Sequence, residues 1–379
     1  MSAAFFVSSL ALAGWIYLFG FRGMFWRASE RDDRPASDPP TWPSVVAVVP
    51  ARDEAELIGE SIGSLLRQDY PGDFRVILVD DQSSDDTAGL ARGFDADGRL
   101  SVIQGTARPP GWTGKLWALK QGVVHAGENH PDYFWFTDAD IAHTKDNLRH
   151  LVGRAEHDSL VMVSLMAKLR CESLAERFIV PAFVFFFQML FPFSWVNRRD
   201  NPVAAAAGGC MLLRRDALEK AGGIDSVRRE IIDDCALARR MKAQGPIWLG
   251  LTERAVSLRR YQYLRDIRQM VSRSAYAQLR YSPMLLAGTI AGMATLYVAP
   301  PLIASFGAGA ARLEAGLCWF CMAVAYQPIL IFYRRTPFWG LALPIIGLFY
   351  AGFTVHSAIQ HGRGLGGMWK GRAQAMTGG

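Results

Sequence analysis

Long segments without charged side chains constrain the fold of this chain more than any other feature of its sequence. Residues 1–21, 283–306, 315–333 and 337–360 contain no Asp, Glu, Lys or Arg. An α-helix needs about 20 apolar residues to cross the hydrocarbon core of a bilayer, so each segment approaches the length of a span. The sequence therefore predicts an N-terminal anchor (1–25), a globular part (26–282), about three transmembrane helices (283–360) and a basic tail (361–379).

The N-terminal segment is predicted to be a permanent anchor rather than a removed signal peptide. No basic residue precedes the apolar run, and no small-x-small cleavage pattern follows it. Arg22, Arg27, Arg31 and Arg34 come soon after it. Because basic residues flank membrane helices on the cytoplasmic side, we expect a multi-pass protein of the inner (cytoplasmic) membrane with a cytoplasmic globular part. Four spans would place the basic tail outside, which leaves the topology of the tail open.

Charge and cysteine content narrow the class of partners. The formal net charge of +6 suits a domain that lies against anionic lipid headgroups. No nucleic-acid recognition module is visible, so we expect no nucleic-acid partner. Five cysteines, an odd number, favour free thiols. Cys318 and Cys321 form a C-x-x-C inside an apolar segment, where helix packing explains them better than metal or redox chemistry.

Strand and helix signals alternate over residues 44–155. Apolar runs at 44–51, 74–81, 100–105 and 133–137 predict short strands, and helically spaced apolar residues predict helices between them. This alternation is typical of a parallel sheet covered by helices, as in Rossmann-like α/β folds. In such sheets, ligands bind outside the carboxyl ends of the strands.

Polar residues gather at that edge of the predicted sheet. Asp80 and Asp81 end one strand, Asp138 and Asp140 follow another, and residues 51–54 follow a third. Adjacent carboxylates repel each other unless a cation or hydrogen-bond donors lie nearby. Carboxylate oxygens prefer hard cations, so the three elements together predict a Mg or Mn site that bridges a diphosphate. A D-x-D sequence taken alone fits a solvated turn equally well.

Five segments, in order along the chain, resemble the motifs of a known enzyme family. They are VVPARDE (48–54), VDDQSSDDT (79–87), FTDAD (136–140), AAGGCMLLRRDALEKAGGI (206–224) and IIDDCALARRM (231–241). With its apolar ends, the chain resembles membrane-bound family 2 glycosyltransferases. It is closest to the hopene-associated glycosyltransferase group and similar to ceramide glucosyltransferases. The resemblance covers about residues 44–282 and implies an α/β GT-A (nucleotide-diphospho-sugar transferase) domain and a metal-dependent enzyme of class EC 2.4.

The resemblance also implies roles for single residues. Asp234 would be the catalytic base and Asp140 the metal ligand. The donor would contact Pro50, Ala51, Arg52 and Glu54 at its base, Asp81 at the uracil or ribose, Lys115 near the diphosphate, Asp138 at the ribose or sugar, and Gly208 and Gly209 beneath the sugar.

The role of Asp234 also has a physical basis of its own. An inverting transfer needs one base to take the proton of the acceptor hydroxyl, whereas a metal and Lys115 stabilise the leaving group without an acid. Asp233 and Asp234 begin an apolar-periodic helix, where the helix dipole favours negative charge. The alternatives are that Asp233 is the base or that both residues only cap the helix.

One motif departs from the family pattern. Membrane members often carry Gln-x-x-Arg-Trp after the base, but here Met270 and Ser274 stand in place of Gln and Trp. Arg273 is the candidate for the Arg of that motif and is predicted to bind the donor. Residues 261–281 place apolar side chains on one face with arginines around it, which predicts a helix at the membrane interface.

Residues 178–196 form another uncharged segment. A single crossing of the membrane there would put Asp140 and Asp234 on opposite sides, so we predict an interfacial, re-entrant or buried segment. Its Phe-rich surface fits either a lipid acceptor or docking against the C-terminal helices.

The predicted function is an inverting glycosyltransferase that moves a sugar from a nucleotide diphosphate sugar, UDP-linked by resemblance, to a hydroxyl of a membrane lipid such as a hopanoid or related terpenoid. The predicted partners are the donor, the lipid acceptor and the bilayer. A polyprenyl-phosphate glycosyltransferase is an alternative that needs a site for an anionic phosphate acceptor, which the arginine-rich residues 254–273 do not exclude. A processive polysaccharide synthase would need more spans. A non-catalytic membrane scaffold would not need Asp81, Asp138, Asp140 and Asp234.

Overall fold

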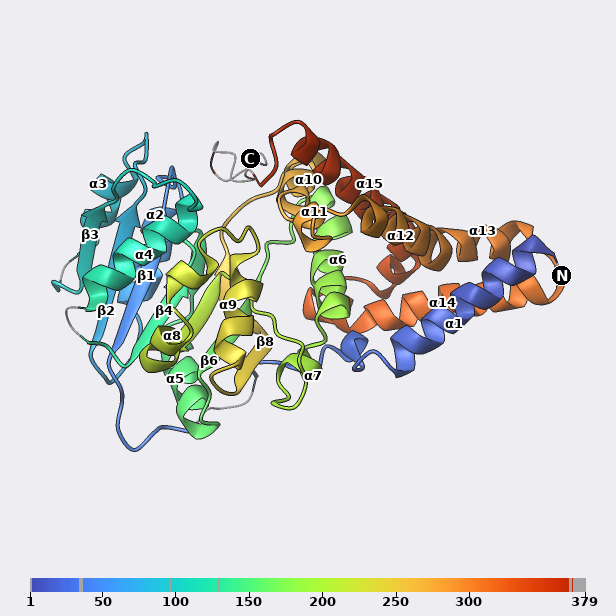
Figure 1. Cartoon of the computed structure of the whole chain (residues 1–379). Helices are drawn as coiled ribbons and strands as arrows, with labels where there is room; N and C mark the ends of the chain where they lie inside the picture. Colours follow the sequence, from blue (N-terminus) through green and yellow to red (C-terminus); the bar gives the residue numbers. More distant parts are fainter. Residues whose placement is uncertain (1, 34–36, 96, 128–129, 368–369, 371–379) are drawn as a thin grey trace.

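The chain folds into a mixed β-sheet with helices on both faces, joined to a set of long apolar helices (Figure 1). The computed structural model describes residues 2–33, 37–95, 97–127, 130–367 and 370, so most of the predicted basic tail lies outside the described residues. The strands are β1 (Val45–Ala51), β2 (Phe74–Asp80), β3 (Leu100–Gln104), β4 (Tyr133–Thr137), β5 (Ile141–His143), β6 (Met162–Lys168), β7 (Cys210–Arg214) and β8 (Ile247–Ser257).

The strands follow the order β3-β2-β1-β4-β7-β6-β8-β5. The first four are parallel, as the alternation over residues 44–155 predicts. Beyond β4 the sheet is mixed, because β7 runs antiparallel to both β4 and β6, and β5 runs antiparallel to β8. The predicted parallel sheet is therefore only half of the whole sheet. The predicted α/β class and the predicted apolar helices are confirmed.

Each face of the sheet buries its own apolar core. Along β1, Val46 and Val48 belong to one core, and Val45, Ala47 and Val49 belong to the other, as strand geometry requires. The helices that cover the sheet are α2 (Ile58–Leu66), α3 (Thr87–Arg92), α4 (Gly114–Gly127), α5 (Asn147–His157), α8 (Arg215–Lys220), α9 (Asp233–Lys242) and the short η2 (Ile224–Val227). Helices α2 and α5 share a core on one face, whereas α4 and α9 share a core on the other.

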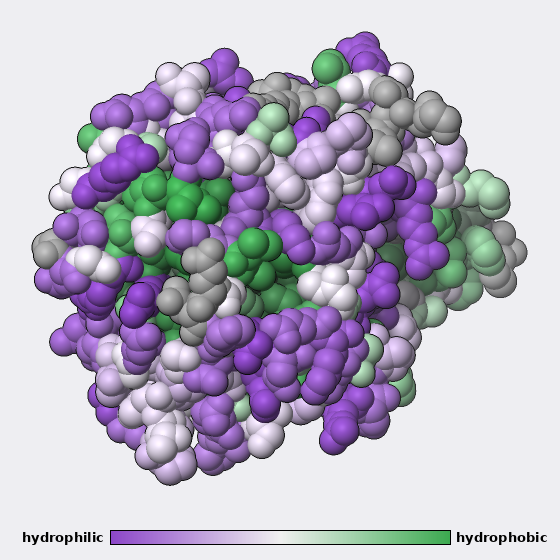
Figure 2. Space-filling model, turned by 60° about the vertical axis from the view of Figure 1, so that its left-hand side comes forward, coloured by the Kyte–Doolittle hydropathy of each residue, from purple (hydrophilic) through white to green (hydrophobic). Residues whose placement is uncertain are grey.

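Four helical segments among the described residues are long and apolar enough to cross a bilayer. They are α1 (Ala3–Gly20), α12 to α13 (Pro283–Met293, the π-helical η3 Ala294–Val298, and Ala299–Phe306), α14 (Gly309–Phe332), and η4 with α15 (Pro337–Ala342 and Leu343–Gly362). Helices α1, α12, α13 and α14 extend away from the sheet (Figure 1). Figure 2 shows a largely hydrophilic surface around the sheet, with hydrophobic residues gathered toward the helical end and in hollows between polar residues.

Polar contacts tie α1 to the other long helices. Ser8 and Ser9 both donate to the Glu314 carboxylate, at 2.7 and 2.9 Å. Trp15 donates from its indole to the carbonyl of Leu296, which lies in the π-helical turn, at 2.9 Å. A π-turn disturbs the regular hydrogen-bond ladder, so an outside donor suits this carbonyl. Such bonds hold α1 against its neighbours in an apolar setting.

The Phe-rich segment forms α6 (Leu174–Leu190) and the short α7 (Phe193–Val196). A capping box between Ser173 and Glu176 begins α6. Much of α6 is buried among other helices, because Phe185 packs on Tyr326 and Phe186 packs on Tyr350. Its placement relative to a membrane stays a prediction.

The stretch that was predicted as one interfacial helix is divided in two. It contains α10 (Leu264–Ser272) and α11 (Ala275–Gln278), and Arg273 is the residue that caps the end of α10. Ser272 and Tyr276 bond to Phe353 and Ser357 of α15, which docks both short helices on α15. A short 3-10 turn, η1 (Phe25–Arg27), links α1 to the globular part.

Candidate functional site

The carboxyl ends of β1, β2 and β4 meet at one edge of the sheet, as parallel strands require. A cavity of about 820 Å³ opens there, between this edge and helices α6, α10 and α15. The residues predicted from the sequence line it except for two. Ala51 and Asp81 are both 0% exposed and lie behind the cavity wall. The predicted residues that line the cavity are Pro50, Arg52, Glu54, Lys115, Asp138, Asp140, Gly208, Gly209, Asp234 and Arg273.

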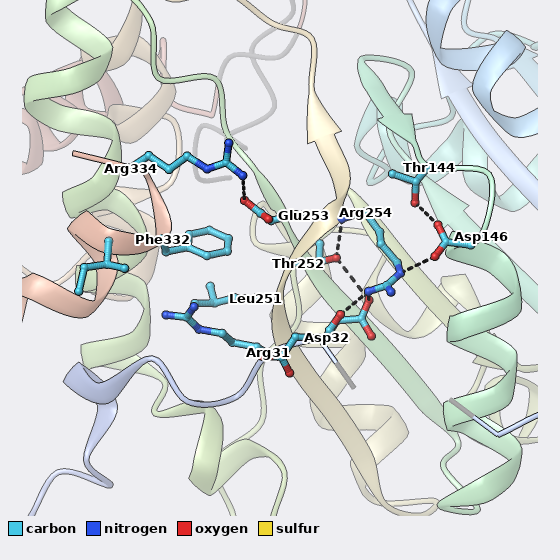
Figure 3. A pocket seen from close by; sticks show the side chains of 12 residues that line it. Arg31, Asp32, Thr144, Asp146, Leu251, Thr252, Glu253, Arg254, Phe332 and Arg334 are labelled. Carbon is cyan, nitrogen blue, oxygen red and sulfur yellow. Dashed lines mark hydrogen bonds and ion pairs between the residues drawn. The ribbon is translucent and has the colours of Figure 1, made fainter. Parts of the chain in front are cut away.

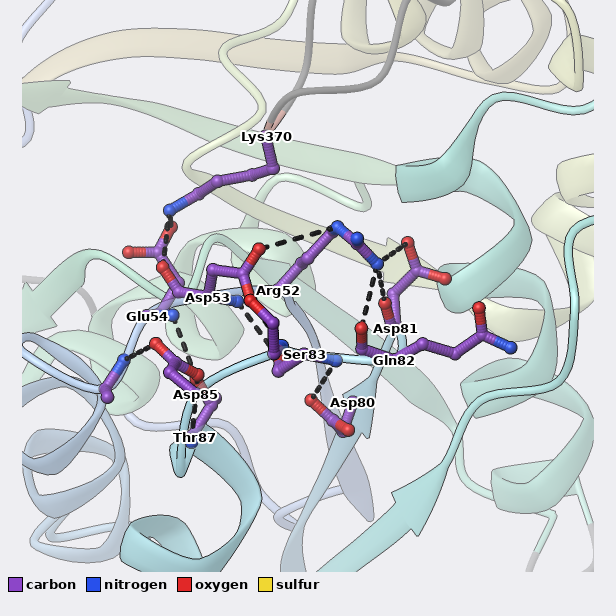
Figure 4. Close-up of polar contacts among 12 residues, drawn as sticks. Arg52, Asp53, Glu54, Asp80, Asp81, Gln82, Ser83, Asp85, Thr87 and Lys370 are labelled. Carbon is purple, nitrogen blue, oxygen red and sulfur yellow. Dashed lines mark hydrogen bonds and ion pairs between the residues drawn. The ribbon is translucent and has the colours of Figure 1, made fainter.

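The adjacent carboxylates at the end of β2 point to different partners (Figure 4). Asp80 accepts hydrogen bonds from the Gln104 side chain at 2.8 Å and from the Ser83 backbone at 3.3 Å. Asp81 lies 3.9 Å from the guanidinium of Arg52, which also donates to the Asp81 carbonyl. The repulsion between neighbouring carboxylates is therefore offset by amides and a guanidinium.

The loop after β1 is held in a fixed shape beside these residues. Asp53 has a positive φ of 49°, and its carboxylate accepts from the Ser84 backbone at 2.6 Å. The Glu54 backbone N–H donates to the Thr87 hydroxyl at 2.9 Å. Positive φ is uncommon in non-glycine residues, and these bonds help to hold the rim of the cavity in this shape.

Lys115 joins the acidic residues of two different elements. Its ammonium lies 2.7 Å from Asp138, which follows β4, and 3.6 Å from Asp233, which begins α9. Burial lowers the pKa of Lys115, but the carboxylates of Asp138 and Asp233 outweigh burial and raise it. Lys115 therefore stays charged and fixes the distance between the two acidic elements.

Asp234 lies next to this cluster. Its Oδ2 accepts a hydrogen bond from the Gly208 backbone at 3.0 Å, and its Oδ1 accepts one from the Cys235 backbone at 2.7 Å. Burial and the neighbouring charge of Asp233 raise the pKa of Asp234 to about 6, while Lys115 opposes the rise. A carboxylate with such a pKa can take a proton near neutral pH.

Asp140 and Glu54 share a guanidinium. Arg259, just after β8, donates to Asp140 at 2.7 Å and to Glu54 at 2.6 Å. Lys370 also bonds to Glu54, at 2.7 Å, and to the carbonyl of Asp53 (Figure 4). Burial raises the pKa of the Glu54 carboxyl despite these partners.

The side chains available to bind a metal here offer carboxylate oxygens, which suit Mg or Mn. Asp138 and Asp140 supply them, but Lys115 and Arg259 each occupy one oxygen of these side chains. Among the described residues, no group of three or more His, Cys, Asp or Glu forms a ready-made metal cage. A metal at this site would therefore need oxygens from the ligand as well.

The opposite wall of the cavity is apolar and cationic. Phe183 and Phe187, one helical turn apart on α6, face the cavity while most of their neighbours are buried. Arg260, Arg268 and Arg273 line the same space, and none of them forms an ion pair within the described part of the chain. The cavity thus combines an acidic floor with an apolar and basic wall.

Sequence patterns did not reveal Arg259 and Lys370 as parts of the site. Arg259 stands in an Arg-Arg pair two residues beyond the end of β8, and its meaning depends on the pairing of β8 with β5. Lys370 lies 316 residues from Glu54 in the sequence (370 − 54), so no local signal links them.

A second cavity, of about 520 Å³, lies where the end of α14 meets β8 (Figure 3). Its polar residues are largely paired with one another. Arg254 bonds to Asp32 and Asp146, and Glu253 pairs with Arg334 at 3.7 Å. We interpret this cavity as a structural junction rather than a reactive site.

Comparison with known proteins identifies one domain within the globular part. Residues 46–222 match the family described as Glycosyl transferase family 2. The chain carries a family 2 glycosyltransferase domain. A 4,4'-diaponeurosporenoate glycosyltransferase from Staphylococcus aureus (strain bovine RF122 / ET3-1) is 35% identical over 113 residues, which are 29% of this chain and 28% of that relative. The same enzyme from strain USA300 matches at 35% over 112 residues.

The fold around the family 2 domain also has a solved counterpart. A mannosyltransferase from Pyrobaculum calidifontis, solved with GDP-Man and Mn²⁺, superposes with a TM-score of 0.58. The similarity covers 93% of this chain and 98% of that chain, at 21% sequence identity. The likeness therefore extends over the apolar helices as well as the family 2 domain, and at this identity it concerns the fold alone.

Proposed function

We propose that this protein is an inverting glycosyltransferase that moves a sugar from a nucleotide diphosphate sugar to a hydroxyl of a membrane lipid. The observation that carries the proposal is the cavity itself. Asp234, with a pKa raised to about 6, lines the same cavity as the acidic residues around Lys115 and the phenylalanines of α6. A site of this kind suits a charged donor on one side and an apolar acceptor on the other.

Asp234 acts as the base. The acceptor hydroxyl oxygen attacks the anomeric carbon, the bond from that carbon to the diphosphate oxygen breaks, and the hydroxyl proton passes to Asp234. Attack opposite the leaving group inverts the configuration at carbon. The hydrogen bonds from Gly208 and Cys235 hold the carboxylate in one orientation, which supports its use as a positioned base.

The donor lies along the edge of the sheet. Pro50, Arg52 and Glu54 border its base, and the buried Ala51 and Asp81 support that wall from behind. Lys115 and Arg273 approach the diphosphate, while Asp138 and Gly209 approach the ribose and sugar. A uridine donor is the preferred choice, on resemblance to membrane members of the family.

Asp140, with Asp138 nearby, would hold the Mg or Mn ion. When bound, the ion neutralises charge on the leaving diphosphate. The solved mannosyltransferase that shares the fold was described with Mn²⁺, which supports a divalent cation here. Asp138 and Asp140 must exchange part of their contact with Lys115 and Arg259 when the ion and donor arrive.

The acceptor enters from the side of α6. A relative named for diaponeurosporenoate, a terpenoid, supports a terpenoid or hopanoid acceptor. Arg260 and Arg268 favour a second candidate, an acceptor with an anionic group such as a polyprenyl phosphate, because they lack ion pairs among the described residues. The four long apolar helices would anchor the protein in the cytoplasmic membrane, with the family 2 domain on the cytoplasmic side.

A donor screen tests the proposal. Purified, detergent-solubilised protein is mixed with Mn²⁺, total membrane lipid and each of a panel of UDP-, GDP- and dTDP-sugars, and nucleotide release is measured. We expect release with one donor, dependent on lipid and lost in Asp234→Asn. Folded protein that binds no nucleotide and releases none would instead support the non-catalytic scaffold.

A further inference from the structure

Arg259 pairs with Asp140, the residue that is predicted to bind the divalent metal ion. Its Nε donates to Asp140 at 2.7 Å, and its Nη2 donates to Glu54 at 2.6 Å. The Asp140 and Glu54 side chains are only 17% and 9% exposed, and the Arg259 side chain is 32% exposed. The predicted metal ligand is thus already neutralised by a residue of the chain itself.

The sheet fixes this contact. Strand β8 pairs antiparallel with β5, with Ile141 opposite Ser257. The backbone N–H of Leu258 then donates to the carbonyl of Asp140 at 2.8 Å. Arg259 is the next residue, so its backbone stays beside Asp140 whatever its side chain does. The strand register holds the Arg259 guanidinium close to the Asp140 carboxylate. The guanidinium therefore competes with any other cation that could bind Asp140.

Removal of Arg259 would change the charge balance at the rim. Glu54 and Asp140 would face each other across a shielded space with fewer cations near them. Two carboxylates that share a poorly solvated site attract a cation more strongly. A divalent ion would then bind more tightly to the carboxylates that the guanidinium now neutralises.

We propose that Arg259 is an internal counter-ion that competes with the divalent cation for Asp140, and that the donor diphosphate relieves this competition by drawing the guanidinium to its own oxygens. The inference rests on the proposed function. Its consequence is coupling: the metal binds weakly alone and more tightly with nucleotide, and nucleotide in turn binds more tightly with metal. Arginine suits this role because the planar guanidinium matches the geometry of both carboxylate and phosphate oxygens. Arg259 acts as a positioning residue, since it works through Asp140.

The adjacent Arg260 provides a matched control. It lines the same cavity and carries the same charge, but it is exposed and forms no ion pair in the described parts of the chain. A general loss of positive charge would affect Arg259→Gln and Arg260→Gln alike. Competition for Asp140 affects Arg259→Gln alone.

The test measures Mn²⁺ binding to the purified full-length protein by electron paramagnetic resonance, without nucleotide and with UDP, GDP or dTDP. For the wild type, we expect the nucleotide that binds to tighten Mn²⁺ about tenfold or more. Arg259→Gln should bind Mn²⁺ alone about tenfold more tightly, and the nucleotide should then add little. Arg260→Gln should bind Mn²⁺ alone only as tightly as the wild type does.

Arg259→Lys is a second variant for the case in which Arg259→Gln does not fold, because it keeps the positive charge. One ammonium cannot bridge both carboxylates as the guanidinium does, so this variant should fall between the wild type and Arg259→Gln. The inference is overturned if folded Arg259→Gln and Arg259→Lys bind Mn²⁺ alone no more tightly than the wild type. If the wild type binds nucleotide and Mn²⁺ with no coupling, only this inference fails. If the wild type binds neither, the proposed function fails with it.

Discussion

The Asp234 carboxylate accepts a hydrogen bond from the backbone of Gly208 at 3.0 Å, and the same glycine leaves room for Lys115. A Cβ atom at position 208 would lie 3.1 Å from the Lys115 ammonium and 3.5 Å from Asp234 Oδ2. Because Gly208 has no side chain, both Lys115 and Asp234 can lie close to its backbone.

Gly208→Ala tests this relationship. The added methyl should displace the Lys115 ammonium, which pairs with Asp138 and Asp233, so we expect kcat to fall about tenfold to a hundredfold, in line with the cost of small misplacements in active sites. Gly127→Ala is the control, because Gly127 lies at the opposite end of α4 from Lys115 and a Cβ there would meet nothing within 4 Å. Steady-state kinetics with the identified donor gives the comparison. Equal rates for the two variants would contradict this account of Gly208.

The pH dependence of kcat/KM reports on Asp234. Its raised pKa means that it is protonated below about pH 6 and cannot accept a proton there, so activity should fall as pH drops through about 6. Asp233→Asn removes a charge that raises this pKa, so the acidic limb should move to lower pH. If the acidic limb of the profile does not move in folded, active Asp233→Asn, then the group that titrates is not Asp234.

Two phenylalanines of α6 should respond in different ways. Phe187 faces the cavity, so Phe187→Ala should raise the KM for the lipid acceptor and leave the KM for the donor unchanged. Phe178 packs on Trp339 and Phe349 instead, so Phe178→Ala should lower the thermal midpoint with little effect on either KM. Kinetics and thermal unfolding in the same detergent make the comparison. A donor effect in Phe187→Ala would show that α6 does not line the acceptor side.

The junction at the second cavity should matter for stability rather than for the reaction. Arg254 neutralises Asp32, whose side chain is 3% exposed (Figure 3). Arg254→Ala would leave that carboxylate without its main partner, a change that typically costs about 3–5 kcal/mol. We expect a clearly lower thermal midpoint and unchanged donor affinity in protein that remains folded. Unchanged thermal stability would mean that Asp32 finds another partner.

Local signals account for the parts of the fold that were predicted correctly. The first four strands each carry a compact apolar run, and helices lie between them as their helically spaced apolar residues predict. Strands β5 to β8 had no comparable prediction, because their identity depends on long-range pairing. Strand β7, for example, is inserted antiparallel between β4 and β6.

The same limit applies to the candidate site. Asp140 and Asp234 stand in recognisable motifs, and the structure brings both to one cavity. Arg259 meets Glu54 across 205 residues, through a strand register that no local pattern encodes. The contact between Arg259 and Asp140 therefore follows from the three-dimensional pairing of the strands and not from the local sequence.

Transfer of labelled sugar into lipid tests the central claim most directly. Purified protein is incubated with radiolabelled nucleotide sugars, Mn²⁺ and membrane lipid, and the label in the organic phase is measured for the wild type and Asp234→Asn. The account predicts label in the lipid with one donor for the wild type, and a loss of about a thousandfold or more in Asp234→Asn, as for other essential catalytic groups. Lipid labelling that is equal in the two proteins, or absent with every donor although nucleotide binds, would contradict it.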